Sequence, residues 1–145
     1  MRLVVLALFL LLAGCGGSGS AFATQANEAC AGANERVRAL GPEPRILTAE
    51  QADWLEELTR IDRAAVADVR ALEPPSDERA AISSMLSGFE RGLARGAAIA
   101  RASRQGDFRA LRSGVDAANA DFSRARRIAV EQSLDECALL GRVDR

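Results

Sequence analysis

A row of apolar residues between positions 108 and 129 constrains the fold of this chain more than any other feature. Successive members lie alternately three and four positions apart, which places all of them on one face of an α-helix. A stripe of this kind is typical of the seam of a left-handed helical bundle. Gly106-Asp107 precedes it and supplies a turn and an N-cap, so we expect a helix from residue 108 onward. The row consists of Phe108, Leu111, Val115, Ala118, Phe122, Ala125 and Ala129.

Two earlier segments show the same helical periodicity. Apolar residues recur every three or four positions over residues 22–40, and Gly41 ends that pattern. A second pattern covers residues 49–72, with Thr48 as the N-cap of a capping box and Pro74 as the stop signal. Both segments are therefore expected to be amphipathic helices.

Two more helices follow from N-cap signals. Residues 77–104 are expected to form one uninterrupted helix with Ser76 as its N-cap. Ser133 begins another capping box, which predicts a short last helix over residues 134–140. Short connections between helices favour antiparallel neighbours. The expected fold class is all-α, an up-down-up-down four-helix bundle with a short C-terminal helix.

Residues 1–14 are predicted to be a signal peptide. Arg2 gives a positive start, and the apolar run of residues 3–13 is shorter than the ~20 residues that a membrane-spanning helix requires. The run ends in Leu12-Ala13-Gly14-Cys15, which resembles the lipobox of bacterial lipoproteins. The resemblance implies that Cys15 is acylated and holds the protein on the extracytoplasmic face of the cell membrane. The alternative is an ordinary signal peptide and a soluble secreted protein.

The rest of the chain divides into a tether and one domain. Residues 15–20 comprise the lipidated cysteine and a Gly/Ser stretch, which is expected to be flexible. Residues 21–145 suit a single helical bundle domain with one core.

The cysteines predict a disulfide. If Cys15 is acylated, Cys30 and Cys137 remain as an even pair in a compartment that permits disulfides. We therefore expect them to be bonded to each other. Two free, buried thiols are the alternative, because unpaired cysteine is among the most buried residue types.

Several short motifs in the mature part also resemble a known group of proteins. They are Asn27-Glu28-Ala29-Cys30, Leu72-Glu73-Pro74-Pro75, Gly106-Asp107 and Cys137-Ala138. They resemble motifs of small helical lipoproteins from high-GC Gram-positive bacteria. The use of arginine without lysine, with many alanines, fits a GC-rich genome. The resemblance implies the fold and the location, and it carries no activity.

Composition excludes most enzyme chemistry. The chain has no lysine, histidine or tyrosine, so it lacks the common general bases and the commonest metal ligand. The chain has no histidine to ligate a diiron centre or a haem, and it has no Asp-rich calcium-binding loop or Gly-rich phosphate-binding loop. The acidic residues Asp53, Glu56 and Glu57 lie in the first turns of a helix, where the helix dipole favours them. We therefore expect no catalytic residue, metal or cofactor. The net charge of -1 also argues against binding to nucleic acid.

Charge is nevertheless uneven along the chain. Residues 90–112 are rich in arginine, whereas residues 43–57 are rich in acids. One interpretation is a basic patch for an anionic wall polymer or a partner protein. The other, which we favour, is that the two segments share a pole and neutralise each other. The candidate arginines are Arg101, Arg104, Arg109 and Arg112.

Three glycines recur every four residues on the third helix, at Gly88, Gly92 and Gly96. Each costs roughly 0.8 to 1 kcal/mol relative to alanine in a helix interior, so something should offset the penalty. We expect a bulky residue such as Trp54 or Phe122 to lie over them, with Gly92 buried. The alternatives are a ligand groove or a docking face for a partner helix.

Three functional hypotheses follow from these features. The preferred one is a lipid-anchored extracytoplasmic binding or interaction module. Its partners would be membrane lipid, through acylated Cys15, and an envelope protein or an anionic wall polymer. The second hypothesis is a purely structural envelope protein, and the third is a carboxylate-dependent enzyme.

Overall fold

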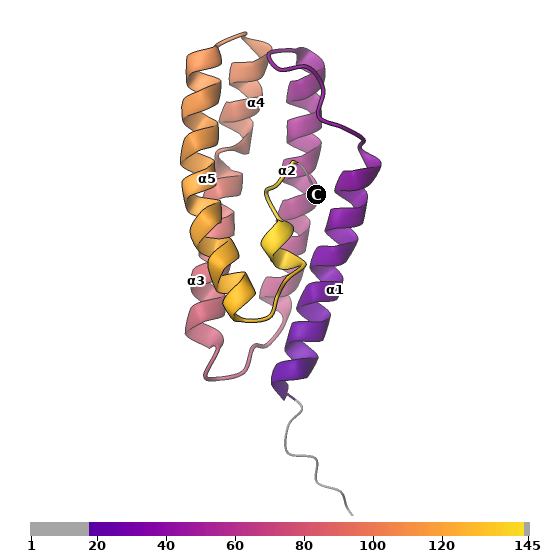
Figure 1. Cartoon of the computed structure of the whole chain (residues 1–145), viewed down its shortest axis with the longest axis vertical. Coiled ribbons are helices and arrows are strands. Elements are labelled where there is room, and N and C mark those ends of the chain that lie inside the picture. The colour runs from indigo at the N-terminus through magenta and orange to yellow at the C-terminus, as the bar shows by residue number, and fades with distance from the viewer. Residues whose placement is uncertain (1–17, 144–145) are drawn as a thin grey trace, which may run out of the picture.

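The computed structural model describes residues 18–143 and is all-helical over that range. The chain passes along the bundle four times, in alternating directions, and forms a four-helix bundle. α3 and α4 together form the third rod (Figure 1). The predicted fold class is therefore confirmed. None of the helices in this range combines the length and the hydropathy that crossing a membrane needs. The elements are α1 (Ser18–Ala39), α2 (Ala49–Ala71), α3 (Arg79–Ala94), α4 (Gly96–Arg104), α5 (Phe108–Glu131) and a single 3-10 turn, η1 (Cys137–Leu139).

Local signals set most helix ends where the sequence predicts them. Gly41, which has a φ of 80°, follows the end of α1. Thr48 caps α2, because its Oγ1 accepts a hydrogen bond of 3.1 Å from the Gln51 N–H. Asp107 caps α5 in the same way, with a distance of 2.9 Å from its Oδ1 to the Ala110 nitrogen.

The third rod differs from its prediction in two respects. Residues 76–78 form a turn, so α3 begins at Arg79, and the prediction that Ser76 is its N-cap is wrong. The rod is also interrupted at Arg95, between α3 and α4. Near this break the guanidinium of Arg63 donates a hydrogen bond of 2.9 Å to the carbonyl of Leu93. The helical spacing of its apolar residues also places Ala97 on the core face of this rod, but Ala97 is exposed.

The predicted short last helix is present only as the 3-10 turn η1, and its predicted N-cap and its extent over residues 134–140 are wrong. Ser133 has a φ of 57° and ends α5 instead of starting a new helix. The N–H of Leu134 bonds to the carbonyl of Ala129 at 2.8 Å, and the N–H of Ser133 bonds to that of Val130 at 3.0 Å. This pair of bonds is a Schellman motif, which terminates a helix. Only the three residues of η1 remain helical after it.

The described part of the chain begins at residue 18, which is also the first residue of α1. Residues 18–20 therefore belong to a helix and not to the predicted flexible tether. Arg2, the apolar run and the Leu12-Ala13-Gly14-Cys15 motif lie outside the described residues.

One core joins the four rods, and most residues of the expected stripes are buried in it. On α5, two members of the predicted stripe are exceptions: Phe108 is 52% exposed and Val115 is 36% exposed. Trp54 lies at the edge of the core, where its indole N–H donates to the carbonyl of Gly41 at 3.3 Å. The largest core side chains are Phe89, Ile61, Ile82, Met85, Leu134 and Leu140.

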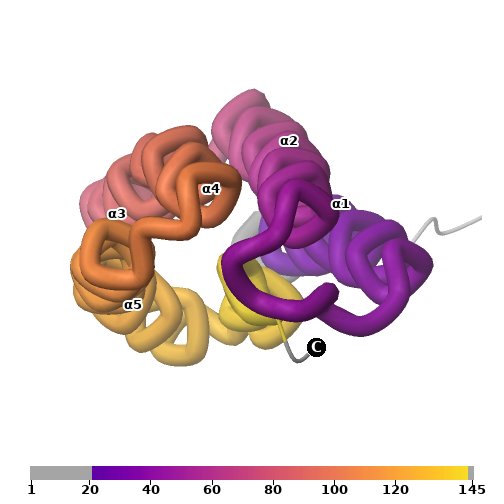
Figure 2. Tube along the Cα trace, turned by 90° about the horizontal axis from the view of Figure 1, so that it is seen from above, coloured from indigo at the N-terminus to yellow at the C-terminus, as the bar shows by residue number. Residues whose placement is uncertain are grey.

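The bundle is closed by the C-terminal segment. Among the described elements, α1 packs only against α2 and η1 and does not reach α5. Figure 2 shows the C-terminal segment between α5 and α1, where it fills this side of the bundle. A disulfide between Cys30 on α1 and Cys137 in η1 fastens the segment, with 5.0 Å between the two Cα atoms. The predicted disulfide is therefore confirmed.

Candidate functional site

The three glycines of the third rod face neighbouring helices, and all three are buried. A Cβ at Gly88 would lie 3.0 Å from the Cβ of Ala125 on α5. A Cβ at Gly92 would collide with the ring of Phe122, and a Cβ at Gly96 would collide with Thr59 of α2. The prediction that Gly92 is buried is therefore confirmed. Of the two bulky residues expected over the glycines, Phe122 covers Gly92, whereas Trp54 covers none of them and Ala125 and Thr59 face the other two.

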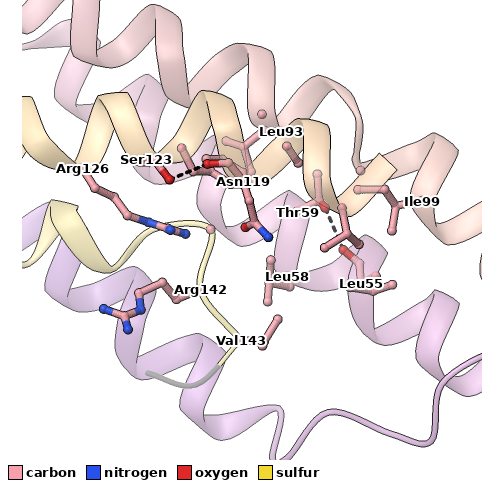
Figure 3. Close-up of a pocket in the computed structure, with 16 residues that line it drawn as sticks. Leu55, Leu58, Thr59, Leu93, Ile99, Asn119, Ser123, Arg126, Arg142 and Val143 are labelled. Carbon is pink, nitrogen blue, oxygen red and sulfur yellow. Dashed lines mark hydrogen bonds between the residues drawn. The ribbon is translucent and has the colours of Figure 1, made fainter. Parts of the chain in front are cut away.

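A groove of about 420 Å³ opens beside this packed surface. It lies between α2, the third rod and α5, and residues 141–143 of the C-terminal segment form its remaining wall. Figure 3 shows Ile99 and Leu55 at one end of the groove and Arg126 and Arg142 at the other. The lining residues are Leu55, Leu58, Thr59, Gly92, Leu93, Gly96, Ile99, Val115, Ala118, Asn119, Phe122, Ser123, Arg126, Gly141, Arg142 and Val143.

Most of the groove wall is apolar. Leu58, Leu93 and Phe122 are buried core residues that present part of their surface to it. Val115, which the sequence placed in the core, lines the groove and is partly exposed there. Val115 is thus a member of the seam that has no helix packed over it at this height. The apolar part of the groove is open surface that a ligand can cover.

Phe122 is fixed between two glycines. A Cβ at Gly92 of α3 would collide with Cδ1, Cε1 and Cζ of its ring, and a Cβ at Gly141 would lie 2.8 Å from Cε2 and Cζ. The Gly141 N–H donates a hydrogen bond of 2.8 Å to the carboxylate of Asp62, which is completely buried. The segment that carries Gly141 is therefore anchored to α2, and the ring has a defined place in the groove wall.

Polar groups gather at one end of the groove. The guanidinium of Arg126 lies 5.3 Å from the centroid of the Phe122 ring, and its Nε donates to the carbonyl of Leu140 at 3.3 Å. The side-chain amide of Asn119 points from α5 into the groove (Figure 3). Arg142 contributes a second positive charge, and none of the lining residues within residues 18–143 is acidic. The groove thus has an apolar body and one basic end.

This arrangement is suited to binding. The lining residues carry two guanidinium groups, an amide and two hydroxyls, and these groups include no pair of a nucleophile and a general base. Across residues 18–143, no group of three or more Asp, Glu, Cys or His side chains is placed to hold a metal ion. A ligand would be held by apolar contact along the groove and by hydrogen bonds at its basic end.

The arginines singled out in the sequence lie apart from the glycines. Arg104 donates hydrogen bonds of 2.6 Å to Asp53 and to Glu56, and the bond from Arg104 lowers the pKa of Glu56. The two oppositely charged segments therefore do neutralise each other here, across α2 and α4. Arg112 approaches Asp116 at 3.9 Å. Arg101 and Arg109 are exposed and form no ion pair within the described part of the chain.

The sequence did not reveal the polar end of the groove. Asn119 and Arg126 lie three residues before and four residues after Phe122, so all three share one edge of α5. That spacing is the available signal, since polar residues at such positions flank an apolar stripe. The wall formed by Gly141 and Arg142 carries no such signal, because it depends on how the C-terminal segment folds back.

The chain was also compared with known proteins. No protein-family model, curated protein or solved structure matches it. Its function is therefore inferred from the groove and from the sequence motifs.

Proposed function

We propose that this protein is a lipoprotein, held by acylated Cys15 on the extracytoplasmic face of the cell membrane, and that its bundle is a binding module. The groove is the observation that carries the proposal. Its volume of about 420 Å³ lies within the range of roughly 300 to 1,000 Å³ that is typical of small-molecule sites. Apolar walls with a few polar groups at one end are also typical of such sites. A purely structural bundle needs no such opening.

Sequence and disulfide together support the proposed location. The short apolar run followed by Leu12-Ala13-Gly14-Cys15 resembles the start of a lipoprotein. The bond between Cys30 and Cys137 suits an exported protein, because disulfides persist in oxidising compartments. Each acyl chain contributes about 0.8 kcal/mol for every buried methylene, so a multiply acylated cysteine would anchor the protein durably.

The bundle geometry is compatible with an anchor before residue 18. α1 starts at the pole where α2 ends and α5 ends (Figure 1). Because α5 runs toward that pole, Arg126 lies nearer to it than Val115 does. The groove is on the side of the bundle, so attachment at this pole leaves its open face accessible.

Detergent partitioning tests the anchor. The wild-type protein, expressed in a bacterium that processes lipoproteins, should enter the detergent phase because of its acyl chains. A Cys15→Ser variant should stay uncleaved or appear in the aqueous phase. Continued partitioning of a correctly exported Cys15→Ser protein into detergent would contradict acylation at that residue.

An uncharged fluorescent probe tests the groove. N-phenyl-1-naphthylamine brightens in apolar sites, and the full chain carrying Cys15→Ser, purified without detergent, should bind it. Val115→Phe should weaken binding several-fold, because Val115 lines the open side of the groove. Val130→Phe is the matched control, since Val130 is an exposed valine on the same helix that does not line the groove. Equal effects of the two variants would contradict binding in the groove.

A further inference from the structure

We infer that the ligand of the groove is an anionic amphiphile, whose apolar part lies along Leu58 and Leu93 and whose single anionic group lies at Arg126. This inference rests on the proposed binding function and names the chemical class of its ligand. It follows from the shape of the groove, the sign of its charge and the fixed position of one guanidinium.

The apolar part of the groove calls for a hydrocarbon body. Ile99 and Leu55 form one end, and Leu58, Leu93 and Phe122 form the wall that leads to the basic end. Burial of apolar surface is worth roughly 25 cal/mol per Å², so an apolar body gains affinity along this whole length. Because Phe122 is confined by Gly92 and Gly141, its ring cannot turn to fill the groove itself.

The charge of the groove selects an anion. Among the described residues that line it, two are arginines and none is acidic. The carboxylate of Asp62 accepts a hydrogen bond from the Gly141 N–H behind the groove wall. Asp62 is completely buried and does not line the groove. A cationic headgroup would therefore meet like charge at the end where Arg126 and Arg142 lie.

Arg126 is positioned to receive the anion. Its guanidinium stacks over Phe122 at 5.3 Å, and the bond from Nε to the Leu140 carbonyl holds it at the end of the apolar wall. A guanidinium stays charged at any physiological pH and matches the geometry of carboxylates and phosphates. The amide of Asn119, which points into the groove, can donate to the same anion (Figure 3).

Three probes with the same ten-carbon chain test this selection: decanoate, decan-1-ol and decyltrimethylammonium. Each competes with N-phenyl-1-naphthylamine on the full chain carrying Cys15→Ser, so no attached acyl group occupies the groove. Decanoate should bind about tenfold more tightly than decan-1-ol, the factor expected for one charge-assisted hydrogen bond. Decyltrimethylammonium should bind most weakly.

Three variants assign the selectivity to the basic end. Arg126→Gln should bring the affinity for decanoate down to that for decan-1-ol. Arg127→Gln makes the same change at the next residue of α5, which is exposed and does not line the groove, and it should preserve the preference. Val115→Glu leaves Arg126 in place and adds negative charge at the open side, so it should weaken decanoate more than decan-1-ol.

The outcomes separate this inference from the proposed function. Equal affinities for the three probes would overturn the anionic class and leave the binding function intact. A preference for decyltrimethylammonium would do the same. Failure of N-phenyl-1-naphthylamine and of all three probes to bind would overturn both. If that protein also sediments as a dimer, the groove is covered by a second copy and the inference is wrong.

Discussion

The α3–α5 seam and the α1 side of the bundle are closed in different ways. At the seam, two helices approach directly, with Gly88 facing Ala125 and Gly92 lying under the ring of Phe122. On the other side, α1 does not reach α5, and the gap holds the C-terminal segment that follows α5. The first side is helix-on-helix packing, and the second combines the burial of Leu134 and Leu140 with a crosslink and polar bonds.

The polar bonds of the second side come from α1 and α2. Asn34 on α1, which is completely buried, donates to the carbonyl of Glu136 at 2.9 Å, and Asn27 donates to that of Ser133 at 2.9 Å. Asp62 on α2 accepts from the Gly141 N–H. The segment buries Leu134 and Leu140 in the core, and these polar bonds satisfy and position its irregular backbone. The groove lies where the two sides meet, since Phe122 belongs to the seam and Gly141 to the segment.

Removing the disulfide should have the largest effect on stability, and it acts on the α1 side of the bundle. We expect Cys30→Ser combined with Cys137→Ser to lower the free energy of unfolding by about 2 to 5 kcal/mol, because the bond closes a loop of 107 residues. The chain-entropy model gives about 4.7 kcal/mol for a loop near this length. Urea unfolding of the variant and the wild type measures the difference.

Reduction provides the control for that experiment. Reductant should destabilise the wild type by a similar amount and leave the double variant unchanged. Amide exchange should speed up first in α1 and around η1, while the amides of α3 and α5 stay protected. Two alkylatable thiols in the native, unreduced protein would contradict the crosslink itself.

Gly92→Leu is the corresponding test of the seam. The new side chain would collide with the ring of Phe122, and overpacking of this kind costs about 1 to 3 kcal/mol. Gly32→Leu is the matched control on α1, because a Cβ there meets no atom within 4 Å. Thermal melting should fall for Gly92→Leu and not for Gly32→Leu. An unchanged melting temperature in the Gly92→Leu protein would show that the seam has room and that direct packing is not what closes it.

The seam could be predicted from the sequence and the other side largely could not. Steps of three and four place Ala118, Phe122 and Ala125 on one face of α5, and a four-residue repeat places the three glycines along the third rod, two on α3 and Gly96 at the start of α4. Both patterns are local, so a single helix already determines which residues lie together. Thr48, Asp107 and Gly41 likewise act within a few residues of the helix ends that they set.

The C-terminal segment depends on contacts that are distant in the sequence. Ser133 was expected to cap a helix, but it ends α5 because Leu134 bonds back to Ala129. The pairing of Cys137 with Cys30 could be inferred by counting cysteines, whereas the bond from Gly141 to Asp62 joins residues 79 positions apart. No local pattern encodes such a bond. A ligand groove beside the glycines was one alternative that the sequence left open, but its walls could not be predicted, since one of them is this segment.

A substitution at Gly32 on α1 should stabilise the protein, whereas substitutions at the glycines of the seam should destabilise it. Gly32 lies inside α1, and a Cβ there would meet nothing within 4 Å. Gly32→Ala should raise the free energy of unfolding by about 0.4 to 1 kcal/mol, because alanine restricts the unfolded chain and favours the helix. The same change at Gly96, where the Cβ would meet Thr59, should destabilise. A loss of stability in Gly32→Ala would mean that this side is as tightly packed as the seam.

The smallest expected effect concerns the polar rim of the seam, where Asp121 of α5 receives hydrogen bonds from Arg91 and Arg95 at 3.2 and 3.1 Å. Burial alone would raise the pKa of Asp121, but the bonds from Arg95 and Arg91 outweigh it and hold that pKa below its ordinary value of 3.8. The folded state thus favours the ionised carboxylate. Its contribution is complete above the unfolded pKa and is lost as the pH falls through the folded pKa.

Asp121→Asn should therefore lower the free energy of unfolding by about 0.2 to 1 kcal/mol at neutral pH, the range for partly exposed ion pairs. The difference in stability from wild type should shrink when the pH falls below the ordinary pKa of the carboxylate. Thermal melting of both proteins at neutral pH and near pH 2.5, roughly one unit below that pKa, measures it. A molar salt concentration at neutral pH should shrink the same difference, because the two arginines are about half exposed. Gly92→Leu supplies the contrast, since a steric overlap with a ring should respond to neither pH nor salt. A difference for Asp121→Asn that persists in acid would assign the residue to packing at the seam and not to its charge.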